Sequence, residues 1–331
     1  MNRKAVALFS GGLDSSLAIK LILVQGIEVV ALHFFTPFCT CNNKGCNSSV
    51  SKVVSQLGIK LKTVFLADEY FEMLKKPKFG YGSNLNPCID CRILILRKAK
   101  EFMEEVGASF IVTGEVLNQR PMSQRLKTLK LIEREAGVEG LVVRPLSARV
   151  LPITIPESMG IVDRDKFLGI VGRSRKVQLS LAEEYGIEGY GCPSGGCLLT
   201  DPSFARRMKD LMIHNPRFTL RDVMLLKVGR HFRISDSAKL VVGRDKKENN
   251  FLEKYCEKSW YLFSVVNTNG PRAVGVGELS EEEILVCCKI VTRYADKVSY
   301  GIKIEVLKDG ERKEYICNEG LSQEELEKKR V

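Results

Sequence analysis

The stretch Ser10-Gly11-Gly12-Leu13-Asp14-Ser15-Ser16 decides how the first half of this chain is read, and it follows directly after the apolar run 5–9. This order predicts a buried strand, a glycine turn and a helix that begins near Leu17. Two adjacent glycines let the backbone turn tightly and come close to an anion. The serine hydroxyls and the N–H groups at the helix start can then surround a phosphate or pyrophosphate. The stretch therefore predicts a phosphate-binding loop.

Two common phosphate-binding patterns are excluded at this loop. No lysine closes it, as G-x-x-x-x-G-K-[ST] requires, and its glycines lack the spacing G-x-G-x-x-G. The alternative interpretation is an ordinary strand–turn–helix in which the serines only cap the helix. The run of glycine and hydroxyl residues favours the anion site.

Length and composition bound the possible classes of protein. The chain has 331 residues, a net charge of +11, 44% hydrophobic and 27% charged residues. This length predicts two or three domains of an ordinary globular protein. No run approaches the roughly 18 apolar residues of a membrane span, and the first apolar run is too short for a signal peptide. We therefore expect a cytoplasmic protein, whose 11 cysteines do not form a disulfide framework.

Strand and helix patterns alternate along the first half of the chain. Strands are expected at 5–9, 28–35, 60–66, 108–114 and 140–145, with helices at 15–25, 47–57, 91–106 and 122–136. This alternation predicts an α/β fold with a doubly wound parallel sheet. Ligands bind beyond the carboxyl ends of such strands, where loop 10–16, His33 and Gly114 are expected to lie. Two further helices are expected at 163–171 and 177–185.

The pattern changes near Phe232, where short strands and turns begin. Strands are expected at 238–242, 260–266, 272–276 and 303–307, and helices near 246–257 and 280–295. We therefore expect three parts. They are a phosphate-binding domain over 1–200, a basic helical connector over 201–230, and a second, smaller α+β domain over 231–331.

The motif Asn86-Pro87-Cys88-Ile89-Asp90-Cys91 lies just before a predicted helix. A helix N-terminus favours the thiolate, so Cys88 or Cys91 can act as a nucleophile or a metal ligand. The C-x-x-C spacing alone also fits a redox pair, half a zinc site, part of an iron–sulfur site or two buried cysteines. Cys197 follows a double-glycine turn and is the natural third member.

Three thiolates suit a 4Fe–4S cluster with one iron open to substrate, or a persulfide relay. Zinc favours four ligands in a structural site, and Cys192 could supply the fourth. We expect Cys88, Cys91 and Cys197 to be the metal ligands, and Cys88 and Cys197 to take part in the chemistry. The spacing leaves open the role of a second group, which consists of Cys39, Cys41 and Cys46.

Arginine-rich segments point to a polyanionic partner. The expected RNA-binding residues are Arg173, Arg175, Lys176, Arg206 and Arg207. Surplus positive charge neutralises phosphates and releases counterions, and the predominance of arginine favours phosphate binding. A solvated charged surface is the alternative.

The motifs together carry a resemblance to known families. Loop 10–16 resembles the PP-loop of the ATP pyrophosphatase superfamily, whose members split ATP between the α- and β-phosphates and adenylate a substrate. With NPCIDCR at 86–92, VTGE at 112–115 and GGC at 195–197, it resembles the ThiI-like and 2-thiouridylase-like tRNA thiolation enzymes. Residues 227–318, with VGRDKKENN at 242–250, resemble the NFACT-R module, an RNA-binding domain.

The resemblance implies an adenine nucleotide alpha hydrolase-like domain that thiolates RNA, in particular tRNA, at the expense of ATP. ATP would lie on loop 10–16, with Mg²⁺ at Asp14, adenine near His33 and Phe34, and Gly114 closing the pocket. Sulfur would come from a persulfide on one of the catalytic cysteines, or from sulfide on the three-cysteine 4Fe–4S cluster, with zinc as the alternative metal. A cysteine desulfurase or free sulfide would supply it.

Two other classes of function stay open. PP-loops also serve ATP-dependent amide or C–N ligases, which need no cysteine triad. A non-catalytic RNA-binding protein would use the C-terminal module as its main contact.

Overall fold

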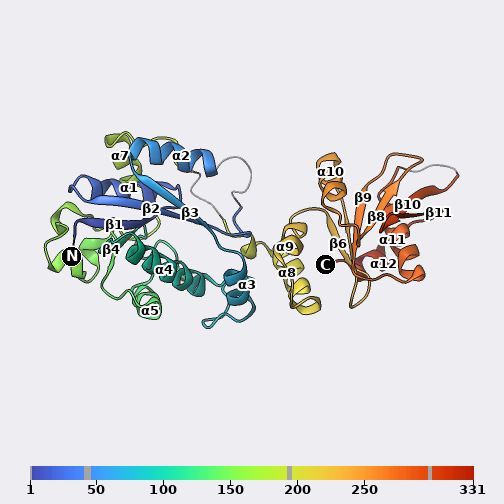
Figure 1. The fold of residues 1–331 in the computed structure, drawn as a ribbon, viewed down its shortest axis with the longest axis horizontal. Coiled ribbons are helices and arrows are strands. Elements are labelled where there is room, and N and C mark those ends of the chain that lie inside the picture. The colour runs from blue at the N-terminus through green and yellow to red at the C-terminus, as the bar shows by residue number, and fades with distance from the viewer. Residues whose placement is uncertain (1, 41–45, 192–195, 297–299) are drawn as a thin grey trace. The chain divides into compact units, whose positions relative to one another are not determined.

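The computed structural model describes residues 2–40, 46–191, 196–296 and 300–331, and Figure 1 labels their helices and strands. The chain divides into two compact units, Met1–Asp201 and Pro202–Val331. Helices α8 (Pro202–His214) and α9 (Leu220–Leu225) lie in the stretch expected to be a connector and are grouped with the second unit. Among the described residues, no helix combines the length and apolar character that crossing a bilayer requires.

The first unit is built on a five-stranded parallel sheet with the strand order β3-β2-β1-β4-β5. Its strands are β1 (Lys4–Leu8), β2 (Glu28–Phe35), β3 (Lys60–Phe65), β4 (Phe110–Thr113) and β5 (Val142–Val143). The chain runs outward from β1 to β3 and then returns to the other side for β4 and β5. This reversal of direction beside β1 defines a doubly wound sheet, so the predicted α/β fold is confirmed.

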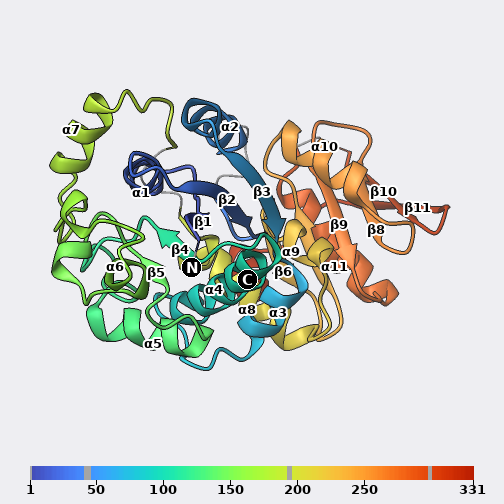
Figure 2. The same cartoon turned by 60° about the vertical axis from the view of Figure 1, so that its left-hand side comes forward.

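Helices cover both faces of this sheet. They are α1 (Leu13–Leu23), α2 (Cys46–Leu57), α3 (Asp68–Lys75), α4 (Cys88–Glu105), α5 (Leu126–Ala136), α6 (Ile155–Ser158) and α7 (Lys176–Glu184). Figures 1 and 2 show α1 and α7 on one face, with α4 and α5 on the other. The carboxyl ends of β1 and β4 consequently open between two helical layers, where ligands bind in folds of this kind.

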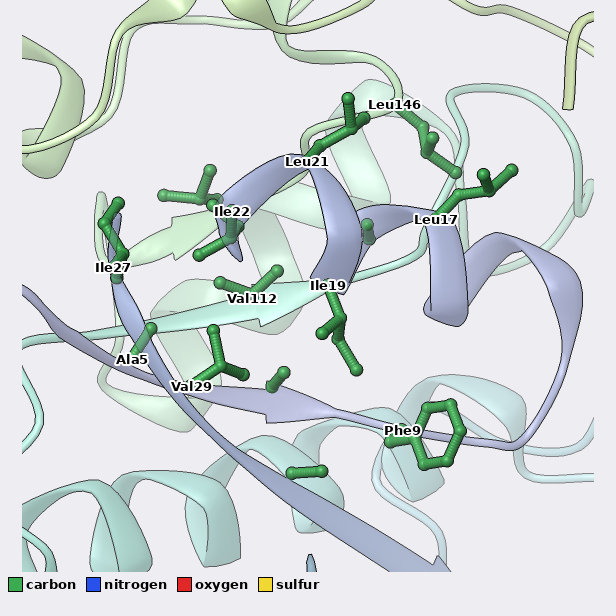
Figure 3. Close-up of a cluster of buried hydrophobic side chains, with 14 of the residues drawn as sticks. Ala5, Phe9, Leu17, Ile19, Leu21, Ile22, Ile27, Val29, Val112 and Leu146 are labelled. Atoms are coloured by element: carbon green, nitrogen blue, oxygen red, sulfur yellow. The ribbon is translucent and has the colours of Figure 1, made fainter. Parts of the chain in front are cut away.

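Alternate side chains of β1 point into two separate cores. Ala5 and Ala7 lie in the core under α1, whereas Val6 lies in the core under α4. Figure 3 shows Ile19 and Ile22 of α1 directed at the strands of the first core. Burying an aliphatic side chain of this size stabilises the fold by about 1.5–3 kcal/mol. The start of α1 is therefore held firmly against the end of β1, which fixes the loop between them.

The prediction of a helix at 163–171 is wrong. Only the 3-10 turn Arg164–Lys166 forms there, capped by the Asp163 side chain. The N–H groups of Leu168 and Ile170 donate instead to the carbonyls of residues 145 and 146, at 2.9 and 2.8 Å. Hydrogen bonds to a distant segment thus replace those of a helix. The helix predicted at 177–185 is confirmed as α7.

The second unit contains a six-stranded antiparallel sheet with the order β11-β10-β8-β9-β7-β6. Its strands are β6 (Arg230–Arg233), β7 (Lys239–Val242), β8 (Tyr261–Val265), β9 (Arg272–Val276), β10 (Ile302–Lys308) and β11 (Glu311–Cys317). Helices α11 (Glu281–Arg293) and α12 (Gln323–Lys329) contribute to one core and α10 (Lys246–Tyr255) to another. The predicted α+β domain is confirmed. The two edge strands, β6 and β11, were not expected, because their charged sequences lack a strong strand pattern.

Candidate active site

The loop between β1 and α1 turns at two glycines. Gly11 has a φ of +75°, and a Cβ at this position would lie 2.7 Å from Val50 Cγ2 of α2. Both the left-handed backbone and the neighbouring helix therefore exclude a side chain. Gly12 is the N-cap of α1, which begins at Leu13, earlier than the expected start near Leu17. Leu13 itself is buried in the core under α1, so it fixes the loop to that core.

Serine hydroxyls hold this loop in shape. Ser15 Oγ and Ser16 Oγ both donate to the Gly12 carbonyl, at 2.8 and 3.0 Å. The Ser10 N–H donates to Ser15 Oγ at 3.3 Å. Ser15 and Ser16 are buried, whereas Ser10 is exposed. The two buried serines stiffen the loop, and Ser10 is the hydroxyl presented to solvent.

Gly114 permits close contact between β4 and the start of α1. A Cβ on Gly114 would lie 2.5 Å from the Ser15 backbone nitrogen and 2.6 Å from the Asp14 carbonyl carbon. Real Cβ atoms do not approach backbone atoms so closely. The end of β4 is therefore in close backbone contact with the start of α1, and the expectation that Gly114 closes a pocket stays a prediction.

Asp14 carries the feature of the loop that fits a cation. Its Oδ2 accepts a hydrogen bond from Gln119 Nε2 at 3.2 Å and lies 3.7 Å from Arg175 Nη2. Its Oδ1 is buried and has no hydrogen-bond partner. A buried carboxylate oxygen without a partner is unfavourable unless a ligand satisfies it. Mg²⁺, which prefers oxygen ligands, suits this position.

The two expected adenine neighbours lie on opposite faces of β2. His33 is buried, and its Nδ1 lies 2.8 Å from the Phe9 carbonyl, just before the loop. Because a carbonyl oxygen can only accept a hydrogen bond, Nδ1 is the ring nitrogen that donates in this contact. Phe34 packs instead against the core under α4. Only His33 supports the loop directly, by fixing the end of β1.

A buried ion-pair network lies next to Gly114, and sequence reasoning did not identify it. Arg144 Nε lies 3.0 Å from Glu115 Oε2, and Arg144 also pairs with Glu133. Arg92 Nε lies 3.6 Å from Glu115 Oε1. Burial by itself raises the pKa of Glu115, but Arg144 and Arg92 outweigh it and leave the pKa below its usual value. The only available signal was that Glu115 and Arg92 belong to the motifs VTGE and NPCIDCR.

Cys88 and Cys91 occupy the first turn of α4, which begins three residues before the start expected at residue 91. Their spacing of three residues places both thiols on the same side of the helix. Burial raises the pKa of Cys91, although Arg92 and a hydrogen bond with Tyr70 partly offset the increase. Burial therefore works against a thiolate at Cys91, and the expected thiolate at Cys88 or Cys91 stays a prediction.

Cys197 lies among the same side chains. Burial raises its pKa to about 12, and Cys91, Cys39 and Cys88 all lie within electrostatic range of its thiol. The backbone of Cys197 pairs with that of Cys39, which follows β2. The structure thus brings the three expected cysteines together and adds Cys39, whose role the spacing had left open.

The thiols and the phosphate-binding loop share one site. The Gly191 N–H donates to the Gly11 carbonyl at 2.8 Å, and Cys197 follows only six residues later. Six residues span at most about 22 Å even when fully extended. A single side chain, that of Arg120, lies within electrostatic range of both Asp14 and Cys88. The two halves of the site are therefore neighbours.

The expected metal site at Cys88, Cys91 and Cys197 stays a prediction. Among the described residues, no group of three or more His, Cys, Asp or Glu side chains is arranged to hold a metal ion. Cys41 and Cys192 lie outside the described residues, and so does the side chain of Cys46. Clustered thiols are nevertheless the ligands that iron–sulfur clusters and zinc prefer.

The expected RNA-binding residues differ in their surroundings. Arg173, Lys176 and Arg206 are exposed. Arg175 is half-buried and lies 3.7 Å from Asp14, so it lies beside loop 10–16. Arg207 donates to backbone carbonyls of α8 and the residue after α9, which ties the two helices together.

Comparison with known families supports the motifs. Residues 1–149 match the family described as thiamine biosynthesis protein (ThiI). Residues 229–330 match the family described as NFACT protein RNA binding domain. Both resemblances inferred from the motifs are confirmed.

Individual relatives share parts of this chain. A probable tRNA sulfurtransferase of Thermoanaerobacter sp. (strain X514) is 33% identical over 150 residues, which are 44% of this chain and 37% of that protein. A tRNA-specific 2-thiouridylase MnmA of Marinobacter nauticus is 25% identical over 320 residues, 88% of this chain and 79% of that protein. A crystal structure of a 4-thiouridine synthetase–RNA complex with bound ATP is 22% identical, covers 68% of this chain and 52% of its own, and has a TM-score of 0.39. This chain therefore spans about 37% of the length of the first of these relatives.

Proposed function

We propose that this protein thiolates RNA, specifically tRNA, in an ATP-dependent reaction. It would adenylate a carbonyl oxygen of a base and then replace that oxygen with sulfur. The observation that carries the proposal is the proximity of two kinds of group. Gly191 binds the phosphate loop, Cys197 follows it closely, and Arg120 lies near both Asp14 and Cys88. An adenylating site and a thiol site are both needed for this chemistry.

Loop 10–16 would bind the pyrophosphate end of ATP, with Ser10 and backbone N–H groups as donors. Asp14 would hold Mg²⁺ through its unpartnered Oδ1, and the ion would neutralise charge on the phosphates. The carbonyl oxygen of a uridine or cytidine attacks the α-phosphorus, and pyrophosphate leaves. The oxygen then departs as part of AMP when sulfur attacks the carbon. Arg175 lies close enough to Asp14 to contribute positive charge to the same phosphates.

Sulfur would be delivered by the clustered thiols. Two forms fit their chemistry: a persulfide on Cys88 or Cys197, or sulfide on a 4Fe–4S cluster held by Cys88, Cys91 and Cys197. Zinc held by the same thiols would supply only structure. A cysteine desulfurase or free sulfide is the proposed source of sulfur.

Exposed basic residues would hold the RNA. Lys176 is the first residue of α7, and Arg173 precedes it in the same segment as Arg175, which pairs with Asp14. Arg206 lies on α8 of the unit that carries the NFACT-type segment. Contacts of this kind bind phosphates without reading sequence, and the target base must leave its stack to reach the site.

The test is a reaction of anaerobically purified protein with ATP, a sulfur source and tRNA that lacks thionucleosides. AMP, pyrophosphate and thionucleosides are measured, together with iron and acid-labile sulfide in the protein. We expect ATP-dependent thionucleoside that is lost in Cys197→Ser and Cys88→Ser and kept in Cys256→Ser, a matched control in the other unit.

Two outcomes would replace the proposal. If AMP and pyrophosphate are released and both cysteine variants keep full activity, the protein is an amide or C–N ligase. If tRNA binds tightly and no AMP is formed, the protein is a non-catalytic RNA-binding protein. Stoichiometric iron and sulfide would select the cluster over the persulfide.

A further inference from the structure

Tyr70 is a buried phenol that the proposed chemistry does not use. It lies on α3, which packs against α4, and only 2% of the residue is exposed. Its hydroxyl group shares a hydrogen bond with the Cys91 side chain, and the thiols of Cys88 and Cys197 lie within electrostatic range. Sequence reasoning did not identify this residue, because nothing in its own segment marks it as a neighbour of the thiols. A hydroxyl group therefore lies among the thiols of the candidate site.

Two contacts hold Tyr70 in this place. Its ring centroid lies 5.3 Å from that of Phe38, which is fully buried in the loop after β2. The carboxylate of Asp90 on α4 accepts hydrogen bonds from two backbone N–H groups of the segment after α3, at 2.8 and 3.1 Å. Asp90 directly precedes Cys91, so the end of α3 is tied to the turn of α4 that carries this thiol. The hydroxyl group consequently keeps its direction toward Cys91.

Tyr70 is the donor in this hydrogen bond whenever Cys91 is a thiolate. Burial raises the pKa of Tyr70 well above its usual value of about 10, so the phenol keeps its proton at neutral pH. A thiolate has no proton to donate, whether it is free or bound to a metal. Hydrogen bonds to the ligating sulfurs are one of the features that set the properties of iron–sulfur clusters. Tyr70 is the kind of donor that such a cluster would need beside Cys91.

We infer that Tyr70 is a positioning residue of the cluster form of this site, in which its hydroxyl group donates to the Cys91 sulfur and favours negative charge on the cluster. This inference rests on the proposed thiolation and on its 4Fe–4S form. An added electron and a bound sulfide ion both increase the negative charge on the ligating sulfurs. An O–H donor is attracted more strongly to a more negative sulfur. Tyr70 would therefore raise the reduction potential of the cluster and tighten the binding of sulfide to its open iron.

The hydrogen bond is tested first on full-length protein without metal. Tyr70→Phe removes the hydroxyl group and keeps the ring that packs on Phe38, and its effect on urea unfolding is measured in the parent protein and in Cys91→Ala. We expect Tyr70→Phe to raise the unfolding equilibrium constant about fivefold in the parent, as loss of one hydrogen bond does. In Cys91→Ala the acceptor is absent, so no increase is expected. Equal effects in the two backgrounds would overturn the inference.

Tyr81→Phe is the matched control for this comparison. The Tyr81 hydroxyl group donates to the Leu74 carbonyl of α3 at 2.6 Å, so it also belongs to this region but binds oxygen instead of sulfur. We expect Tyr81→Phe to change the unfolding equilibrium equally in the parent protein and in Cys91→Ala. An effect of Tyr81→Phe that also depends on Cys91 would mean that the coupling is not specific to the O–H···S contact, which would overturn the inference.

The second arm measures the cluster itself. The parent, Tyr70→Phe and Tyr81→Phe are reconstituted anaerobically with iron and sulfide, and their iron content, reduction potential and affinity for added sulfide are determined. We expect equal iron in all three and a lower potential in Tyr70→Phe alone, by up to about 59 mV, which is a tenfold change for one electron. Sulfide should bind to Tyr70→Phe more weakly, by up to about tenfold. An unchanged potential in Tyr70→Phe, or a parent protein that binds no iron, would overturn the inference.

Failure of the proposed function gives a different result. If Tyr70→Phe lowers the potential but the parent protein forms no thionucleoside from ATP, sulfide and tRNA, the thiolation proposal is wrong and the hydrogen bond of Tyr70 to the cluster ligand is supported. If the parent protein forms thionucleoside and Tyr70→Phe leaves the potential unchanged, the thiolation proposal is supported and the role inferred for Tyr70 is wrong.

Discussion

Replacing Gly114 with alanine would test whether the end of β4 must approach the phosphate loop closely. The new Cβ would lie 2.5 Å from the Ser15 nitrogen and 2.6 Å from the Asp14 carbonyl carbon. Ordinary contacts between carbon atoms begin at about 3.5 Å, so roughly 1 Å must be gained by moving backbone. Overpacking of this kind costs about 1–3 kcal/mol of stability. Misplacing catalytic groups by about 1 Å can lower a rate about 100-fold.

The matched control for this variant is Gly169→Ala in the same unit. A Cβ at Gly169 would meet its nearest atoms, Arg149 Cβ and Val150 Cγ1, at an ordinary 3.5 Å. Urea unfolding measures the stability of both variants, and the rate of pyrophosphate release from ATP measures whether loop 10–16 still functions. We expect Gly114→Ala to lose both stability and pyrophosphate release while the control keeps them. If the two variants unfold at the same urea concentration and release pyrophosphate at the same rate, the close approach at Gly114 is not required.

Two further predictions concern buried charge. Replacing Arg144 with methionine removes the guanidinium that pairs with both Glu115 and Glu133 and leaves Glu115 only Arg92, and breaking a buried pair in this way costs about 3–5 kcal/mol. Because Arg144 and Arg92 keep the pKa of Glu115 below its usual value, the stabilisation is present near neutral pH and is lost as the pH falls through that lowered pKa. Urea unfolding of both proteins at pH 7 and in acid checks this. The difference in free energy of unfolding between parent and variant should be smaller in acid, and an unchanged difference would contradict the reasoning. In the second unit, burial lowers the pKa of Lys239 from 10.5 to about 8. Below pH 8 the ammonium is buried at a cost. Between about pH 8 and 10.5 only the unfolded chain holds the proton, so stability rises with pH by at most about 3 kcal/mol. Lys239→Met should be more stable than the parent at pH 7 and should remove that rise, whereas parallel pH profiles would refute the assignment.

Local patterns in the sequence were enough to predict the framework of the site. The glycines and serines of loop 10–16 act through their own backbone freedom and hydroxyl groups, so their role can be read without knowing their neighbours. The strand and helix alternation likewise depends on periodicity within each element, and the doubly wound sheet followed from it. Cys88 and Cys91 could be placed at a helix start for the same reason.

Contacts between distant segments could not be predicted in this way. The segment 163–171 has a helical pattern, but its backbone bonds to residues 145 and 146 instead. The charges of Glu115 and Arg144 have no local signature of pairing, because 29 residues separate them. Burial, a property of the packed unit, raises the pKa of Cys91 and could not be predicted from its place at a helix start.

Loop 10–16 was therefore determined by sequence alone, whereas its partners were decided by the tertiary structure. Glycine conformations and hydroxyl caps are local energies that the residues carry with them. The pairing of Cys39 with Cys197 depends instead on two segments about 158 residues apart meeting in one register. Only the packing of the loop after β2 against the segment beyond Gly196 brings them together. The physical reason is that the reactivity of a thiol depends on the residues around it, and the tertiary structure determines which residues those are.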